Sequence, residues 1–298
     1  MPETDHPGGT VVAPPAETVH LAELTWEEVR GAAARDAVIV LPTGSIEQHG
    51  PHLPVKTDTL LVTAVTAEAV RRAAARVPVY LAPTLWLGLS THHAAFFSLT
   101  VTFDTYQRVL VELAESLIRV GFQRLLFVNG HGGNSDPLRL AVTRLRDRHR
   151  VLVATVDYWD VARDEFDRIR DSGPGGMGHA CEWETSGVWH LEPHLVRRDR
   201  IAAEYPPTIP GWFAIDMTMP GGPVKVGTRF EDLTRRGVVG DPTLASPEKG
   251  RRFFEAAVER LTELLVSFAD WQLIAGLGAR AGSGGAQVPA ADESPRTL

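Results

Sequence analysis

The sequence predicts an α/β fold in which a largely parallel sheet is covered by helices on both faces. Short apolar runs alternate with longer amphipathic segments through most of the 298 residues, an alternation typical of βαβ units. Apolar residues make up 44% of the chain and charged residues 22%. This is the ordinary composition of a globular protein with a large core.

The predicted elements follow one another in chain order. The apolar run at residues 38–41 indicates a buried strand, and the helix predicted at 59–76 is expected to be capped by Thr57 or Asp58. Gly121 is expected to end the helix at 106–120. The remaining predictions are strands at 79–82, 125–128 and 151–156 and helices at 137–149 and 247–271.

The two ends of the chain differ in composition from the part between them. Residues 1–18 are rich in Pro, Gly and Thr, and residues 276–298 are rich in small and polar side chains. Both segments are therefore expected to be disordered, with one domain at 19–275. Segments 173–177 and 206–223 are expected to be loops that form pocket walls.

Charge and cysteine content exclude several classes of protein. The 37 acidic and 30 basic side chains give a formal charge of −7, which argues against nucleic acid or an anionic membrane as partner. The single cysteine, Cys181, excludes an intrachain disulfide and fits a reducing compartment. No apolar stretch reaches spanning length, and no secretion-signal pattern opens the chain. We expect a cytoplasmic protein.

Metal-type ligands gather directly after the first predicted strand. Residues 44–58 contain Glu47, His49, His52 and Asp58, at a strand end of the kind where open α/β sheets bind ligands. Glu47 and His49 are two apart, so in extended backbone they leave on the same face. Carboxylates with imidazoles suit a divalent transition metal. The structural alternative is that Glu47 caps a turn and His49 is a hydrogen-bonded loop residue.

A glycine-rich turn follows the strand predicted at 125–128. Its sequence is Asn-Gly-His-Gly-Gly-Asn, and His131 stands between glycines that let the backbone approach a ligand closely. Such a turn could also cradle a phosphate. It lacks the Lys-Ser/Thr pair of a P-loop, so the phosphate interpretation is the weaker one.

Further candidates lie in two other segments. Glu184 falls in the first turn of a helical pattern, where it is either a ligand or a partner of the helix dipole. His179 precedes it on a loop and is free to act on a substrate. His92, with its neighbour His93, follows another strand and is expected to line the same cleft. Trp183 is either a pocket wall or a half-buried aromatic residue.

Together these motifs resemble the creatininase (creatinine amidohydrolase) family. The resemblance rests on Gly-Ser-Ile-Glu-Gln-His-Gly-Pro-His-Leu-Pro with Thr57-Asp58, on Asn-Gly-His-Gly-Gly-Asn, and on Gly-His-Ala followed by Glu-Thr-Ser. They occur in the family's order within residues 20 to 270. The resemblance implies a three-layer α/β/α fold, a two-metal amidohydrolase site and a homo-oligomer, often a hexamer.

The resemblance also assigns roles to individual residues. It implies that Glu47 and His131 hold one metal, that His49 holds the other, and that Asp58 bridges both. His179 matches the family's proposed acid–base histidine.

The chain departs from creatininase itself at several positions. Gly133 stands where creatininase has a metal-binding glutamate, and we hypothesise that Glu184 supplies the missing carboxylate. Gly132, Gly175 and Gly176 stand where creatininase has the tyrosine, tryptophan and aspartate that close on its ring. Creatinine is therefore not the expected substrate.

The expected activity is hydrolysis of a non-standard amide, such as a cyclic amide or formamide, by a metal-activated hydroxide. Backbone N–H groups of Gly132 and Gly133 are expected to hold the oxyanion, while His179 protonates the leaving nitrogen. His92, Gly132, Gly133 and Trp183 are the expected substrate contacts. Zn²⁺, Mn²⁺ and Fe²⁺ fit the ligands equally well.

Two other functions remain open from the sequence. One is a metallopeptidase that trims a short peptide, as the mycofactocin-peptide peptidases of the family do. The other is a non-catalytic protein that binds metal or nucleotide.

Overall fold

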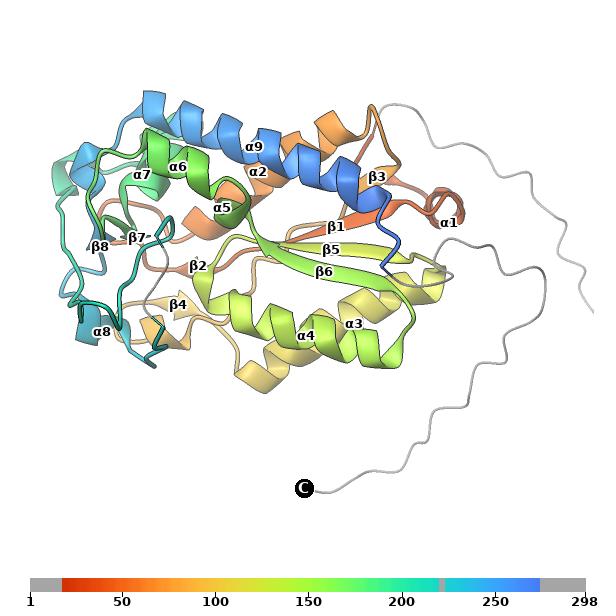
Figure 1. Cartoon of the computed structure of the whole chain (residues 1–298), viewed down its shortest axis with the longest axis horizontal. Coiled ribbons are helices and arrows are strands. Elements are labelled where there is room, and N and C mark those ends of the chain that lie inside the picture. The colour runs from red at the N-terminus through yellow and green to blue at the C-terminus, as the bar shows by residue number, and fades with distance from the viewer. Residues whose placement is uncertain (1–17, 220–222, 274–298) are drawn as a thin grey trace, which may run out of the picture.

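The computed structural model describes residues 18–219 and 223–273. Its central sheet contains four parallel strands, β1 (Val38–Thr43), β3 (Val79–Leu81), β5 (Arg124–Asn129) and β6 (Leu152–Asp157). They lie in the order β3-β1-β5-β6 (Figure 1). Each overlaps a strand predicted from the sequence, so the parallel sheet is confirmed.

Helices cover both faces of this sheet (Figure 1). One layer contains α1 (Trp26–Ala34), α3 (Phe103–Val120) and α4 (Ser135–Arg148), and the other contains α2 (Thr57–Ala73), α5 (Tyr158–Val161), α6 (Arg163–Ile169), α7 (Glu182–Leu191) and α9 (Pro247–Ala269). Alternate strand residues serve the two layers: Val38 and Val40 pack with α2, α7 and α9, whereas Ile39 and Leu41 pack with α1, α3 and α4. The three-layer α/β/α architecture is confirmed.

The ends of the predicted helices differ from the observed ends by a few residues. Gly121, with φ of 116°, ends α3 as predicted. The prediction for α2 is wrong in one respect that affects the site. Its N-cap is Lys56, and Thr57 and Asp58 are already in the first turn. The helix begins earlier than predicted because a turn precedes it, in which Thr57 N–H donates to the Pro54 carbonyl oxygen.

Several short elements carry too little periodicity to be predicted from sequence. They are β2 (Ile46–Glu47), β4 (Ser98–Leu99), β7 (Met177–His179), β8 (Val239–Gly240) and α8 (Phe230–Leu233). Strand β2 pairs with β4, and β7 pairs with β8, both antiparallel. These small ribbons fix the backbone at Glu47 and His179.

The segments expected to be disordered, 1–18 and 276–298, lie outside the described residues except for Thr18. Of the expected loops, 173–177 ends at Met177, where β7 begins, and the described part of 206–223 is irregular backbone with turns, bends and one isolated bridge between Ile209 and Phe213. Within 18–219 and 223–273, no helix combines the length and apolarity needed to cross a bilayer.

Candidate active site

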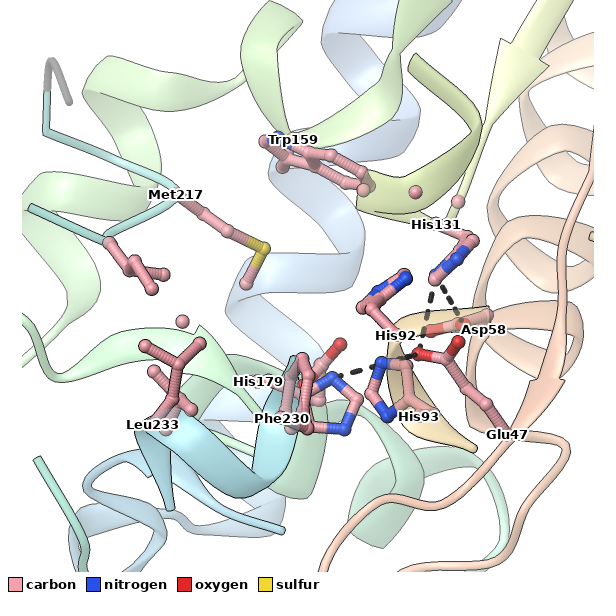
Figure 2. Close-up of a pocket in the computed structure, with 17 residues that line it drawn as sticks. Glu47, Asp58, His92, His93, His131, Trp159, His179, Met217, Phe230 and Leu233 are labelled. Atoms are coloured by element: carbon pink, nitrogen blue, oxygen red, sulfur yellow. Dashed lines mark ion pairs between the residues drawn. The ribbon is translucent and has the colours of Figure 1, made fainter. Parts of the chain in front are cut away.

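The predicted ligands converge beyond the carboxyl ends of β1 and β5. Figure 2 shows three of them, Glu47, Asp58 and His131, facing one another. Strands β1 and β5 pair in parallel with Thr43 opposite Asn129, so the segments that follow them emerge side by side. Glu47 lies in β2, Asp58 in the first turn of α2, His131 just after β5, and Glu184 in the first turn of α7. Segments far apart in the chain therefore build one site.

His131 forms one half of the cluster with two carboxylates. Its Nδ1 lies 3.3 Å from Glu47 Oε1 and 3.2 Å from Asp58 Oδ2. Its Nε2 lies 3.1 Å from the Leu89 carbonyl oxygen, which can only accept, so Nε2 carries a proton and donates it. In a neutral His131 the Nδ1 lone pair therefore faces the cluster and could bind a cation there, as metal-binding histidines do.

His49 forms the other half in the same manner. Its Nδ1 donates to the Glu47 carbonyl oxygen at 3.1 Å, leaving Nε2 to face the cluster. That atom lies 3.0 Å from Asp58 Oδ1 and 3.5 Å from Glu184 Oε1. One oxygen of Asp58 therefore faces His49, and the other faces His131.

The chemistry of these residues fits divalent cations. Although they lie close to opposite charges, Glu47 Oε1, His49 Nε2 and Asp58 Oδ2 are buried and lack a hydrogen-bond partner among the described residues. Glu47, His49 and Asp58 each offer one such ligand atom, and these atoms lie within 4.8 Å of one another. Unpaired buried polar atoms are costly unless something satisfies them. Metal ions on both sides of Asp58 would do so.

The charges of the cluster are strongly coupled. Burial lowers the pKa of His131, but Glu47 and Asp58 outweigh it and raise that pKa to about 10. Burial likewise opposes the rise at His49, whose pKa Asp58 and Glu184 hold well above its usual value. The pKa of Glu47 is well below its usual range because His131 and His93 outweigh the effect of burial. Protons and metal ions would therefore compete for the same ligand atoms.

His179, the predicted acid–base residue, lies at the end of β7 beside this cluster. Its Nε2 donates to the Gln48 carbonyl oxygen at 2.8 Å. Its Nδ1 lies 3.8 Å from Glu47 Oε1 and is therefore the atom that can exchange a proton. Burial, followed by the neighbouring His49 and His93, lowers the pKa of His179 well below its usual value.

The side chain of Gln48 was not anticipated as part of the site. Its Oε1 accepts a hydrogen bond from Gly50 N–H at 2.8 Å, which fixes the orientation of the amide. Its Nε2 then donates to His93 Nδ1 at 3.0 Å, and His93 Nε2 lies 3.1 Å from Glu47 Oε1. A chain of hydrogen bonds therefore orients His93 against Glu47. In the sequence, Gln48 lies between Glu47 and His49, and this position is the signal that could have identified it as a site residue.

His92 lines the pocket, as predicted, although His93 makes the closer contact with the carboxylates. Burial, and then the neighbouring His93 and His131, lower the pKa of His92 to about 4. The ring is therefore neutral near pH 7. It is stacked with His131, with ring centroids 5.7 Å apart.

The glycines of the turn after β5 occupy different surroundings. A Cβ at Gly132 would have no atom within 4 Å, whereas a Cβ at Gly133 would overlap His131 Nε2 and the Leu89 carbonyl oxygen. A carboxylate side chain at 133 therefore cannot be accommodated without rearranging His131. Glu184 contributes from the opposite side, with Oε1 near His49 and Oε2 accepting from Cys181 N–H at 3.4 Å.

Trp183, predicted as a substrate contact, lies elsewhere. Its side chain is fully buried and packs on Phe166 and Phe253, while its indole N–H donates to Tyr158 Oη at 2.9 Å. Helix α7 turns this face toward α9, so Trp183 belongs to the core. Trp159 lines the pocket instead.

The cluster opens into a cavity of about 160 Å³. Besides the ionisable residues and glycines, six apolar side chains line it: Trp159, Ile215, Met217, Phe230, Leu233 and Val239. The site thus combines a metal-type cluster, a histidine poised to carry a proton and space for a small organic group. It can hydrolyse a bond that requires both electrophilic activation and protonation of the leaving group.

Comparison with known proteins agrees with this geometry. The model of the family described as creatinine amidohydrolase matches residues 22–265. The chain is 35% identical over 234 residues to a mycofactocin precursor peptide peptidase of Mycobacterium tuberculosis, covering 74% of this chain and 81% of that protein. It is 30% identical over 270 residues to a creatinine amidohydrolase of Pseudomonas putida, covering 84% and 97%.

Solved structures show the same likeness. A manganese form of creatininase superimposes with a TM-score of 0.70 at 27% identity, covering 86% of this chain and 100% of that chain. Together with the converging ligands, these matches show that the chain belongs to the creatininase family of metal-dependent amidohydrolases.

Proposed function

We propose that the chain hydrolyses a small amide at a centre of two divalent cations that share Asp58. Glu47, His131 and Asp58 Oδ2 would hold one cation, and His49, Glu184 and Asp58 Oδ1 the other. The observation that carries this proposal is the division of the two Asp58 oxygens between two tethered histidines. Two such cations lower the pKa of a water molecule and polarise a carbonyl group.

The residues around the cluster supply the proton transfers. His179 Nδ1 would take a proton as water oxygen bonds to the amide carbon. It would then return that proton to the nitrogen as the C–N bond breaks. This second transfer is needed because an amide anion is too basic to leave. The tether from Nε2 to the Gln48 carbonyl keeps Nδ1 as the exchanging atom throughout.

The turn after β5 would hold the acyl part of the substrate. Gly132 faces open space in the pocket, so its N–H and that of Gly133 are available for the oxyanion. His92, neutral and beside His131, would contact the same group. The phosphate interpretation of this turn gains no support, because the carboxylates of Glu47 and Asp58 lie beside His131 and would repel a phosphate.

The substrate we favour is a non-standard amide other than creatinine, such as a cyclic amide or formamide. Gly132, Gly175 and Gly176 provide none of the bulky side chains expected for closure on creatinine. A second candidate is a peptidase that trims short peptides. It is favoured by the 35% identity to a mycofactocin precursor peptide peptidase.

Metal reconstitution joined to a substrate panel tests this proposal. Protein depleted of metal would be reloaded with Zn²⁺, Mn²⁺ or Fe²⁺ and assayed against creatinine, cyclic amides, formamides and tri- to pentapeptides. Two bound metals per subunit and turnover of a cyclic or formyl amide would support the first candidate. Turnover confined to peptides would support the second, and no turnover by fully loaded protein would refute both.

We further propose that residues 19–275 form one catalytic domain and that the protein is a cytoplasmic homo-oligomer, a hexamer by family resemblance. The single cysteine fits a reducing compartment. Light scattering would measure the subunit number.

A further inference from the structure

The two walls of the cavity have opposite chemistry (Figure 2). One wall consists of the ionisable cluster with Gly130, Gly132 and Gly133. The other, which we call the apolar wall, consists of Trp159, Ile215, Met217, Phe230, Leu233 and Val239. Phe230 forms the border between the two walls, because its ring stacks on His93 with centroids 3.8 Å apart. Among the described residues that line the cavity there is no lysine or arginine.

We propose that the apolar wall receives an uncharged, apolar group attached to the scissile amide, either a short branched alkyl group or a single ring. This proposal rests on the proposed amide hydrolysis and adds the class of substrate. The cavity holds about 160 Å³ in all, and a cavity of about 150 Å³ binds benzene, so the amide and its apolar group must together be small.

One segment of the apolar wall, which carries Ile215 and Met217, is anchored by a buried ion pair. Asp216 lies between Ile215 and Met217, and its carboxylate binds the Arg170 guanidinium at 2.9 Å. The side chains of this pair are 1% and 5% exposed, so their charges neutralise each other away from the cavity. The same carboxylate accepts the Gly175 N–H at 2.8 Å. The pair therefore anchors the segment while Ile215 and Met217 line the cavity.

A charged substituent would be disfavoured at this wall. Its hydration would be lost against apolar side chains without any opposite charge to replace it. An apolar substituent gains free energy from the same burial.

A matched pair of amides tests the proposal on metal-depleted protein, where no turnover occurs. In succinamate a carboxylate replaces the isopropyl group of 4-methylpentanamide, and the shape is nearly the same. Binding would be followed by tryptophan fluorescence, with Trp159→Phe used to assign the signal to the cavity. We expect 4-methylpentanamide to bind at least about tenfold more tightly than succinamate. Equal affinities, or no binding of either amide, would overturn the proposal.

A charge introduced into the wall should reverse this preference. Met217→Lys is expected to tighten succinamate binding and to weaken 4-methylpentanamide binding by about tenfold each. Met219→Lys is the matched control, because Met219 lies two residues along the same segment and is exposed. An unchanged preference in folded Met217→Lys would contradict the proposal. Failure of the metal-loaded protein to hydrolyse any amide would refute the proposed function but leave this binding preference measurable.

Discussion

The turn after β5 and the end of β7 present two histidines in similar settings. His131 and His179 are both buried, and each donates Nε2–H to a backbone carbonyl. Each therefore directs Nδ1 toward Glu47. The backbone thus selects the same tautomer of the ring at both places.

Their neighbours nevertheless move the two pKa values in opposite directions. At His131 the effect of burial is outweighed by Glu47 and Asp58, so the pKa rises to about 10. At His179 burial acts together with nearby histidines, and the pKa falls well below its usual value. The carbonyl tether fixes which nitrogen faces the site, and the surrounding charges decide whether that nitrogen suits a cation or a mobile proton.

The largest expected effect comes from removing the charge of Asp58, which lies beside His131 but is not in contact with His179. Asp58→Asn should abolish stoichiometric binding of both metals, because both halves of the cluster depend on this carboxylate. Turnover should fall at least about 10³-fold. Metal content by elemental analysis is the direct measurement. Asp136→Asn, at a side chain that is 86% exposed, is the control, and retention of both metals by Asp58→Asn would contradict the two-metal assignment.

His179→Ala should separate proton transfer from metal binding. Both metals should remain, because the cluster keeps its carboxylates and two histidines, while turnover falls about 10²–10⁴-fold. Elemental analysis and kcat would be measured on the same preparation. His194→Ala, at a side chain that is 72% exposed, should leave both quantities unchanged. Nearly full activity in His179→Ala would assign the proton donor to another residue.

A smaller effect is expected from Gln48→Leu, which leaves the carbonyl tether of His179 intact. The variant loses the amide that bonds to Gly50 and His93 and whose Nε2 lies 3.1 Å from His179 Nε2, so His93 is no longer oriented against Glu47. Metal affinity should fall about 10–100-fold, as for other groups that orient ligands. Competition with a chelator would measure this affinity. The exposed Gln272 provides the control variant Gln272→Leu, and equal affinities would show that the chain of hydrogen bonds is dispensable.

The residues that follow regular strands could be predicted from the sequence. Glu47, His49, Asp58 and His131 follow strands that are clear in the sequence, and parallel pairing necessarily brings those strand ends together. The parallel sheet follows from the same alternation of strands and helices.

Other features depend on contacts that no local pattern encodes. The sequence does not distinguish Trp183 from Trp159. The packing of α7 against α9 buries Trp183 in the core, whereas Trp159 lines the cavity. Met217 and Leu233 reach the cavity through irregular backbone and a single-turn helix. Their role depends on how distant segments pack, which propensity and periodicity do not specify.

A third histidine, His52, has a pKa that is lowered chiefly by burial. His52 is buried and bonds to Thr185 Oγ1 at 2.9 Å, and burial, followed by the charge of His49, lowers its pKa to about 4. The unfolded chain takes up this proton near pH 6.5, whereas the folded protein does so only near pH 4. The contribution of His52 to stability is therefore complete above pH 6.5 and is lost as the pH falls toward 4.

The corresponding experiment compares His52→Asn with the unaltered protein by urea unfolding. The free-energy difference between them should shrink by up to about 3 kcal/mol between pH 7 and pH 4. The exposed His194 supplies the control variant His194→Asn, for which we expect no such change. A difference that stays constant with pH would mean that His52 titrates normally in the folded protein.

The smallest expected effect tests the tether of His131 itself. Gly133→Ala places a methyl group against His131 Nε2 and the Leu89 carbonyl, the two atoms of that tether, whereas Gly132→Ala places it in open space. Gly133→Ala should cost about 1–3 kcal/mol of stability, as overpacked sites do, and should also weaken metal binding. Gly132→Ala should change stability by less than about 0.5 kcal/mol. Neither glycine has a positive φ, so the backbone at both positions is compatible with alanine. A difference in stability or metal affinity between the two variants would show that the hydrogen bond to the Leu89 carbonyl constrains the His131 ring. Equal stability together with equal metal affinity would show that it does not.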